Sequence, residues 1–242
     1  MIEGESRGVE HKEGEPSGRE IDFHLLRHAE AAGEGIDVPL SETGQVQAQE
    51  AAQALLQEVV AKGGGAIKFM ASPVRRARET AEIMQQTIEA ALAEQKISNV
   101  RLMLLRQREA LHSAGVIGPL KAQGIEDPVE YWLSHPESVA GANPEAVAER
   151  LRGVINHLQA LSDRLPPGER IHYVGVTHEV PQAALLNNLS GKTLNELGGR
   201  IKNCEPIEIN FQGDSDSGPE LVFRDFRMSL EAGNEEAGQL PA

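Results

Sequence analysis

Uninterrupted apolar runs alternate with helically spaced apolar residues along most of this 242-residue chain. The first run begins at Ile21 and stops at Arg27, too short and too continuous for an amphipathic helix, so it predicts a buried strand. Further strands are predicted over residues 66–71, 100–105 and 171–177. The helices predicted between them have buried stripes formed by Ala48, Ala52, Leu55 and Val59; by Ala77, Ala81, Met84, Ile88 and Ala91; and by Val147, Leu151, Val154, Leu158, Leu161 and Leu165.

Capping residues mark where these helices begin. Ser41, Ser72 and Asn143 are the expected N-caps, because each offers a side-chain oxygen to the first backbone N–H groups. Proline follows Ser72 and Asn143 at the first helical position, where its missing N–H does no harm. A further helix is predicted from about Val180 to about Leu189.

The pattern changes to simple alternation near the end of the chain. Ile207, Ile209 and Phe211 alternate with polar residues, and residues 221–226 form one further predicted strand, which together indicate a hairpin at a sheet edge. Strand and helix alternate elsewhere, which is typical of a parallel sheet covered by helices. We therefore predict an α/β fold, a three-layer α/β/α sandwich whose central sheet is mostly parallel with an antiparallel edge.

The two ends of the chain and one internal stretch lack this periodicity. Residues 1–20, which are acidic, and residues 228–242 are polar and predict disordered tails. The remaining residues, 21–227, are predicted to form a single domain. Within it, residues 106–143 are rich in proline and glycine and contain one short helical piece after Asp127, so we expect an irregular insertion, which is usually functional or mobile.

Composition excludes several functional classes. The net charge of −14 argues against a nucleic-acid binder, although a locally positive pocket for a small anion remains compatible with it. The single cysteine, Cys204, excludes an intramolecular disulfide and a Cys-rich zinc site. We expect a cytoplasmic protein without a membrane partner, because neither a signal-peptide pattern nor a membrane-length apolar run is present. The sequence leaves the oligomeric state open.

Three predicted strands end in cationic or imidazole side chains. Residues 27–28, 72–76 and 177–178 follow the first, second and fourth strands and contain two histidines and several arginines. In folds of this class ligands bind outside the carboxyl ends of the strands, so we expect these segments to meet at one rim. A guanidinium holds a phosphate dianion, and an imidazole attacks phosphorus or transfers a proton. The pattern therefore indicates phosphate chemistry.

Simpler roles compete with this interpretation. Arg76 lies among other arginines, and charged runs on helices are usually solvated faces. The position of His178 at a strand end suits a helix-capping or core histidine as well as it suits a phosphate ligand. His24 lies four residues before His28, a spacing that suggests metal ligation on a helix, but on a strand we expect it to be structural. We expect His112, in the insertion, to lie in solvent.

Four segments resemble the histidine phosphatase superfamily, which has the phosphoglycerate-mutase-like fold. They are Arg27-His28-Ala29-Glu30, Leu40-Ser41-x-x-Gly44, Ser72-Pro73-x-x-Arg76-Ala77-x-x-Thr80-Ala81 and Val174-x-Val176-Thr177-His178. The short span from Arg27 to Leu40 looks like that of the short bacterial phosphohistidine phosphatases. The insertion at 106–143 does not match that short group.

The resemblance implies a role for each matching residue. His28 would be the nucleophile that takes the phosphoryl group, and Arg27, Arg76 and His178 would bind its oxygens. Two guanidiniums suit the charge spread over those oxygens, so neither a metal nor another cofactor is expected. The flanking arginines should also keep His28 neutral in the free enzyme. The partner would be a small phosphorylated substrate or a phosphohistidine protein.

Two positions depart from the family pattern. The family commonly has an acid in a Leu-x-Glu context, but here Leu105-Arg106 is followed by Gln107, so Glu109 becomes the candidate proton donor. Glu179 stands where relatives often have glycine, and we expect it to contact the substrate, raising the pKa of His178 or repelling phosphate.

The prediction is a metal-independent phosphatase acting through phosphohistidine. A phosphoglycerate-type mutase and a non-catalytic phospho-ligand-binding protein are the alternatives.

Overall fold

The computed structural model describes residues 19–35, 37–112, 115–213 and 218–230. They form a seven-stranded sheet in the order β3-β2-β4-β1-β5-β6-β7. The strands are β1 (Arg19–Arg27), β2 (Gly65–Ala71), β3 (Val100–Gln107), β4 (Arg170–Thr177), β5 (Pro206–Gly213), β6 (Glu220–Phe223) and β7 (Phe226–Ser229). The first four are parallel, and β5, β6 and β7 are antiparallel to their neighbours, as the sequence predicts.

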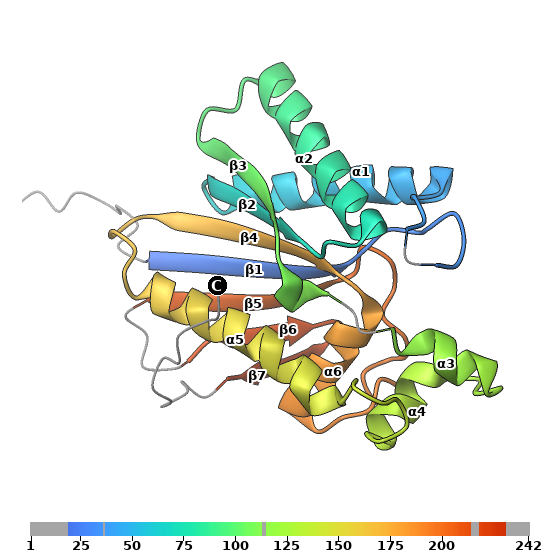
Figure 1. The fold of residues 1–242 in the computed structure, drawn as a ribbon. Coiled ribbons are helices and arrows are strands. Elements are labelled where there is room, and N and C mark those ends of the chain that lie inside the picture. The colour runs from blue at the N-terminus through green and yellow to red at the C-terminus, as the bar shows by residue number, and fades with distance from the viewer. Residues whose placement is uncertain (1–18, 36, 113–114, 214–217, 231–242) are drawn as a thin grey trace, which may run out of the picture.

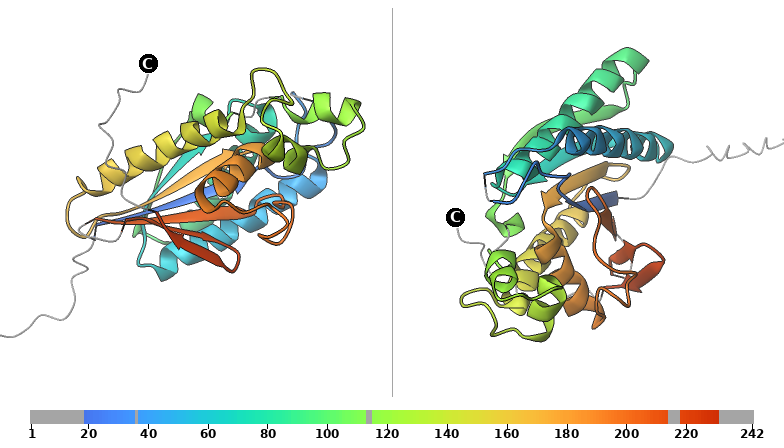
Figure 2. Two further views of the ribbon diagram at one scale, coloured as in Figure 1. Left: turned by 90° about the horizontal axis from the view of Figure 1, so that it is seen from below. Right: turned by 90° about the vertical axis from the view of Figure 1, so that its right-hand side faces the viewer.

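Helices cover both faces of this sheet, which confirms the three-layer α/β/α sandwich (Figures 1 and 2). On one face lie α1 (Glu42–Ala61) and α2 (Arg75–Gln95), and on the other lie α5 (Pro144–Ser162) and α6 (Glu179–Ser190). The short elements of the insertion are the 3-10 turn η1 (Glu109–Leu111), α3 (Ile117–Ala122) and α4 (Pro128–Ser134). Among the described residues, no helix is both long and apolar enough to span a membrane.

Strand β1 is buried on both faces because its alternate side chains enter two separate cores. Ile21, Phe23 and Leu25 pack in the core under α5 and α6. Leu26 packs in the core under α1 and α2, and strand alternation places Asp22 and His24 on that same face.

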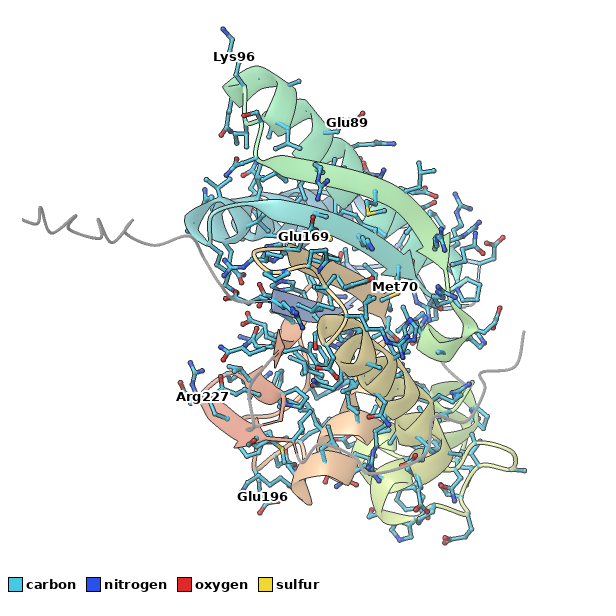
Figure 3. The ribbon with its side chains drawn as sticks, turned by 90° about the vertical axis from the view of Figure 1, so that its left-hand side faces the viewer. Met70, Glu89, Lys96, Glu169, Glu196 and Arg227 are labelled. Carbon is cyan, nitrogen blue, oxygen red and sulfur yellow. The ribbon has the colours of Figure 1, made fainter. Side chains whose placement is uncertain are left out.

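Two of the three expected N-caps are confirmed, and one is wrong. Ser41 accepts from the backbone N–H of Gly44, and Asn143 accepts from that of Glu145. Helix α2 instead begins at Arg75, after Val74. Its other end is marked by Lys96 in Figure 3, and this capping residue has a left-handed backbone with a φ of 55°. Ser72 lies outside the helix, and its hydroxyl contacts His178, the residue that follows β4.

The structure also differs from the predicted boundaries. Residues 221–226 are not one strand, because a turn at Arg224, whose φ is 54°, separates β6 from β7. The insertion contains α3 besides the predicted helix after Asp127; α3 has only six residues, too few to show a helical period. The sheet starts at Arg19 and ends at Ser229, so it reaches two residues past each predicted domain boundary. Most of both predicted tails lies outside the described residues.

Candidate active site

The carboxyl ends of β1, β2 and β4 meet at one rim of the sheet, as expected. Strand β4 lies between β1 and β2, so the residues that leave these strands are neighbours in space. The backbone N–H of His28 donates to the carbonyl of Thr177 over 2.9 Å, and that of Ser72 donates to Val176 over 2.9 Å. These bonds continue the pairing of the strands into the loops.

Hydrogen bonds to both ring nitrogens fix the tautomer of His28. Its Nδ1 lies 2.7 Å from the carbonyl oxygen of Ala29, which only accepts, so Nδ1 has the proton. Its Nε2 accepts a hydrogen bond of 2.9 Å from Nε of Arg76 and therefore has the lone pair. Burial lowers the pKa of His28 to about 3, and the charges of Arg76 and Arg27 contribute. The imidazole is neutral, as predicted.

Arg76 joins His28 to His178. Its NH2 lies 3.3 Å from Nδ1 of His178, while its NH1 donates to the carbonyl of Gly35 over 2.7 Å. The rings of His28 and His178 are 5.1 Å apart between centroids, in an edge-on arrangement. Nε2 of His178 lies 3.0 Å from the hydroxyl of Ser72. Arg76 therefore does not lie on a solvated helix face. Ser72 contacts a histidine of the site, a role that we did not predict from the sequence.

Glu179 contacts arginines rather than a histidine. Its carboxylate lies 3.3 Å from NH1 of Arg27 and accepts two hydrogen bonds from the guanidinium of Arg200. Arg27 also donates to the carbonyl of Ile201. The expectation that Glu179 raises the pKa of His178 is wrong, because burial, His28 and Arg76 lower that pKa well below its usual value. Arg200 was missed because it follows no predicted strand.

Two further side chains fix the loop that follows His28. The hydroxyl of Thr80 accepts from the N–H of Ala29 over 3.0 Å and donates to the carbonyl of Arg76 over 2.7 Å. The side-chain amide of Asn203 donates to the carbonyl of His28 over 2.8 Å. Thr80 belongs to a motif quoted above, whereas Asn203 has no signal in the sequence.

Glu109 lies on η1, which contacts the end of β4 through a hydrogen bond of 2.7 Å from the hydroxyl of Thr177 to the carbonyl of Leu111. It is exposed on η1, and its side chain makes no hydrogen bond or ion pair with any other described residue. His112, three residues later, is half-buried rather than in solvent, and its Nδ1 is buried with no hydrogen-bond partner among the described residues. Its charge contributes to the lowered pKa of His178.

Comparison with known proteins agrees with this arrangement. The model of the histidine phosphatase superfamily (branch 1) matches residues 23–221. The chain belongs to the histidine phosphatase superfamily. No curated protein sequence matches this superfamily member.

Solved structures share the fold of this histidine phosphatase superfamily member at low sequence identity. "Mycobacterial hydrolase 1" has a TM-score of 0.56 at 20% identity, covering 79% of this chain and 92% of its own. A mycobacterial glucosyl-3-phosphoglycerate phosphatase complexed with VO3 has a TM-score of 0.55 at 19% identity, covering 78% and 90%. A phosphoglycerate mutase from Bacillus anthracis has a TM-score of 0.53 at 17% identity, covering 81% and 90%.

Proposed function

We propose that this chain is a metal-independent phosphatase that hydrolyses phosphomonoesters, or phosphohistidine, through a covalent phosphohistidine at His28. The observation that supports it most directly is the unprotonated Nε2 of His28, which accepts a hydrogen bond of 2.9 Å from the guanidinium of Arg76. A nucleophile and a fixed cation at this distance suit one phosphoryl group, whose oxygens take the charge as it is transferred.

The reaction follows from this geometry in two displacements. Nε2 of His28 attacks phosphorus, the bond to the ester oxygen breaks, and the leaving oxygen takes a proton from an acid. Water then attacks the phosphohistidine and gives a proton to the deprotonated acid, the P–N bond breaks, and inorganic phosphate leaves. Arg76, Arg27 and His178 bind the phosphoryl oxygens throughout, so Arg76 exchanges its contact with His28 for one with the substrate.

Glu109 is our proposed acid. His112 competes with it because its side chain is half-buried, affects the pKa of His178, and has an Nδ1 without a hydrogen-bond partner among the described residues. An acid matters most for a poor leaving group. Glu109→Gln should therefore slow hydrolysis of alkyl phosphates far more than that of activated aryl phosphates. The same selective loss in His112→Asn, with Glu109→Gln unaffected, would assign the role to His112.

The partner that we propose is a small phosphorylated substrate or a phosphohistidine protein in the cytoplasm. A phosphoglycerate-type mutase is less favoured because the span from Arg27 to Leu40 is short. A binding protein without turnover is less favoured because Nε2 of His28 is unprotonated and can attack once Arg76 turns from it to the substrate.

Hydrolysis of a substrate panel tests the proposal. Three proteins would be compared in the presence of a chelator: wild type, His28→Ala and the control His157→Ala, which changes an exposed histidine. Each would be incubated with sugar phosphates, glycerate phosphates, nucleotides and a phosphohistidine peptide. Wild type and His157→Ala should release phosphate from at least one class, and His28→Ala should lose about 1,000-fold or more of that rate. Equal rates in wild type and His28→Ala, or none in either, would overturn it.

A further inference from the structure

A second cluster of polar side chains lies between the sheet and α1, toward the amino ends of β1 and β4. It consists of Asp22 and His24 on β1 and His172 on β4, which are 5%, 4% and 0% exposed. One ligand atom from each lies within 4.8 Å of the others. The cluster is separate from the phosphate site, because His28 and His178 leave the opposite ends of the same strands.

His172 and Asp22 face each other with unsatisfied ligand atoms. Nδ1 of His172 lies 3.1 Å from Oδ2 of Asp22, and among the described residues both atoms are buried without a hydrogen-bond partner. A proton on Nδ1 or a metal ion between the two atoms would satisfy them. The tautomer that donates from Nε2 to the carbonyl oxygen of Gly64, over 3.4 Å, leaves the lone pair of Nδ1 free to bind a metal ion.

His24 favours the metal ion. Within the part of the chain that the structure describes, its Nε2 is buried without a hydrogen-bond partner. A proton shared by Asp22 and His172 leaves this atom unsatisfied, whereas a metal ion binds all three side chains.

We propose that Asp22, His24 and His172 bind a divalent transition metal of the Zn²⁺ class, which ties β1 to β4. Two imidazoles and a carboxylate are typical ligands of Zn²⁺. Ligand atoms about 2.0 Å from a tetrahedral ion are about 3.3 Å apart, close to the 3.1 Å between Asp22 and His172. The bond from the other ring nitrogen of His172 to Gly64 is the usual support of a ligating histidine. Glu58 and Glu208 lie near His24 and extend the donor set.

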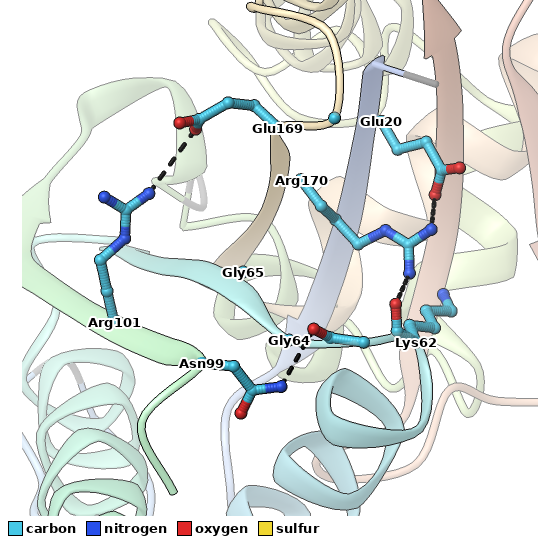
Figure 4. Close-up of a pocket in the computed structure, with 10 residues that line it drawn as sticks. Glu20, Lys62, Gly64, Gly65, Asn99, Arg101, Glu169 and Arg170 are labelled. Carbon is cyan, nitrogen blue, oxygen red and sulfur yellow. Dashed lines mark hydrogen bonds and ion pairs between the residues drawn. The ribbon is translucent and has the colours of Figure 1, made fainter. Parts of the chain in front are cut away.

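Lys62 competes with the metal and marks its route of entry. Its Nζ lies 3.2 Å from Asp22 and 2.7 Å from Glu58, so an ammonium now neutralises these carboxylates. The side chain is one-third exposed and lines a pocket of about 280 Å³ together with Gly64 and Arg170 (Figure 4). Lys62 contacts Asp22, and Gly64 contacts His172. Displacing the side chain of Lys62 toward solvent would therefore connect this pocket with the three ligands.

Metal titration of the full chain tests the proposal. Chelator-treated protein would be titrated with Co²⁺, followed by visible absorption, and with Zn²⁺ in competition with a chromophoric chelator. Wild type and His28→Ala should bind one ion per chain with a tetrahedral Co²⁺ spectrum. His24→Ala and Asp22→Asn should weaken binding about 100-fold or more, and His157→Ala should not. Absence of binding in wild type, or its loss in His28→Ala alone, would overturn the proposal.

A surface variant keeps the test decisive if the buried variants do not fold. Lys62→Met removes the competing cation and should tighten Zn²⁺ binding about tenfold or more. Lys121→Met is the matched control, because Lys121 pairs with Glu34 on the surface as Lys62 pairs with Glu58. Equal Zn²⁺ affinities in the two lysine variants and wild type would contradict the site.

Discussion

His28 combines two properties that a free histidine lacks at the same time. Contact with the carbonyl of Ala29 fixes the proton on Nδ1, and burial beside Arg76 keeps the ring neutral far below the ordinary pKa of about 6.5. The cost of burying an imidazolium next to two guanidiniums therefore keeps Nε2 in its nucleophilic form. In the proposed mechanism, these contacts set the protonation state of His28 before substrate binds.

The pH dependence of kcat/KM should show this preparation. A histidine of ordinary pKa falls from about 75% neutral at pH 7 to about 3% at pH 5. Because the pKa of His28 is lowered to about 3, its neutral form persists to pH 5 and is lost only as the pH falls through that value. With an activated aryl phosphate, whose leaving group needs no acid, and after correction for ionisation of the substrate, kcat/KM should change less than about twofold over this interval. An acid limb near pH 6.5 would contradict the lowered pKa.

Glu179 should act on the substrate through Arg27. Glu179→Gln keeps the volume but removes the charge that holds Arg27 and Arg200, so Arg27 loses its fixed position. We expect KM to rise and kcat/KM to fall about tenfold, with a smaller change in kcat. Steady-state kinetics would measure this split, with the exposed Glu196→Gln as control. A variant with normal KM would show that Arg27 needs no such partner.

At the scale of elements, the start of α1 is locked against the loop that follows His28. Ser41 accepts from the N–H of Gly44 over 2.9 Å and donates to the side chain of Glu30 over 2.7 Å. A Cβ on Gly44 would lie 2.0 Å from the backbone oxygen of Glu30. This close approach gives a physical reason for the Leu40-Ser41-x-x-Gly44 segment.

Two glycine-to-alanine substitutions in helices should therefore have opposite effects. Gly44→Ala forces the backbone of Glu30 to move and should lower the free energy of unfolding by about 1–3 kcal/mol. Gly153→Ala, in the middle of α5 with open space around the new Cβ, should raise it by up to about 1 kcal/mol. Urea unfolding measures both. Equal effects of the same sign would argue against the close contact at Gly44.

How far the sequence predicts the structure depends on whether a feature is local. The strands, the long helices and the rim containing Arg27, His28, Arg76 and His178 follow from periodicity and motif order. The Arg27–Glu179–Arg200 network and the bond from Ser72 to His178 join distant segments, and their residue types are common on protein surfaces. Nothing in their spacing distinguishes them, so only the structure identifies them.

At the scale of the whole molecule, polar groups are concentrated at both ends of the same strands. The carboxyl ends hold the cluster of arginines and histidines around Arg76, and the amino-terminal halves hold the buried cluster around His24. Both regions bury neutral histidines within a chain whose net charge is −14. The stability of the fold is consequently linked to pH through imidazoles rather than through net charge alone.

This linkage predicts acid sensitivity of the metal-free protein. The pKa values of His24 and His28 are lowered to about 4 and about 3, so between these values and about 6.5 the unfolded chain binds more protons than the folded one. Their contribution is complete above pH 6.5 and is lost as the pH falls, by about 2 kcal/mol each at pH 5. Urea titrations at pH 7 and pH 5 would measure it. Equal stability at both pH values would contradict buried neutral histidines.

Trapping the covalent intermediate tests the central claim most directly. Wild type would be mixed with a hydrolysed phosphomonoester, quenched in alkali and digested, and the modified peptide sequenced by mass spectrometry. We predict an acid-labile phosphoryl group on His28, formed and lost within the turnover time and absent from His28→Ala. A phosphoryl group on another residue, or substrate turnover without any phosphorylated protein, would contradict the proposed mechanism.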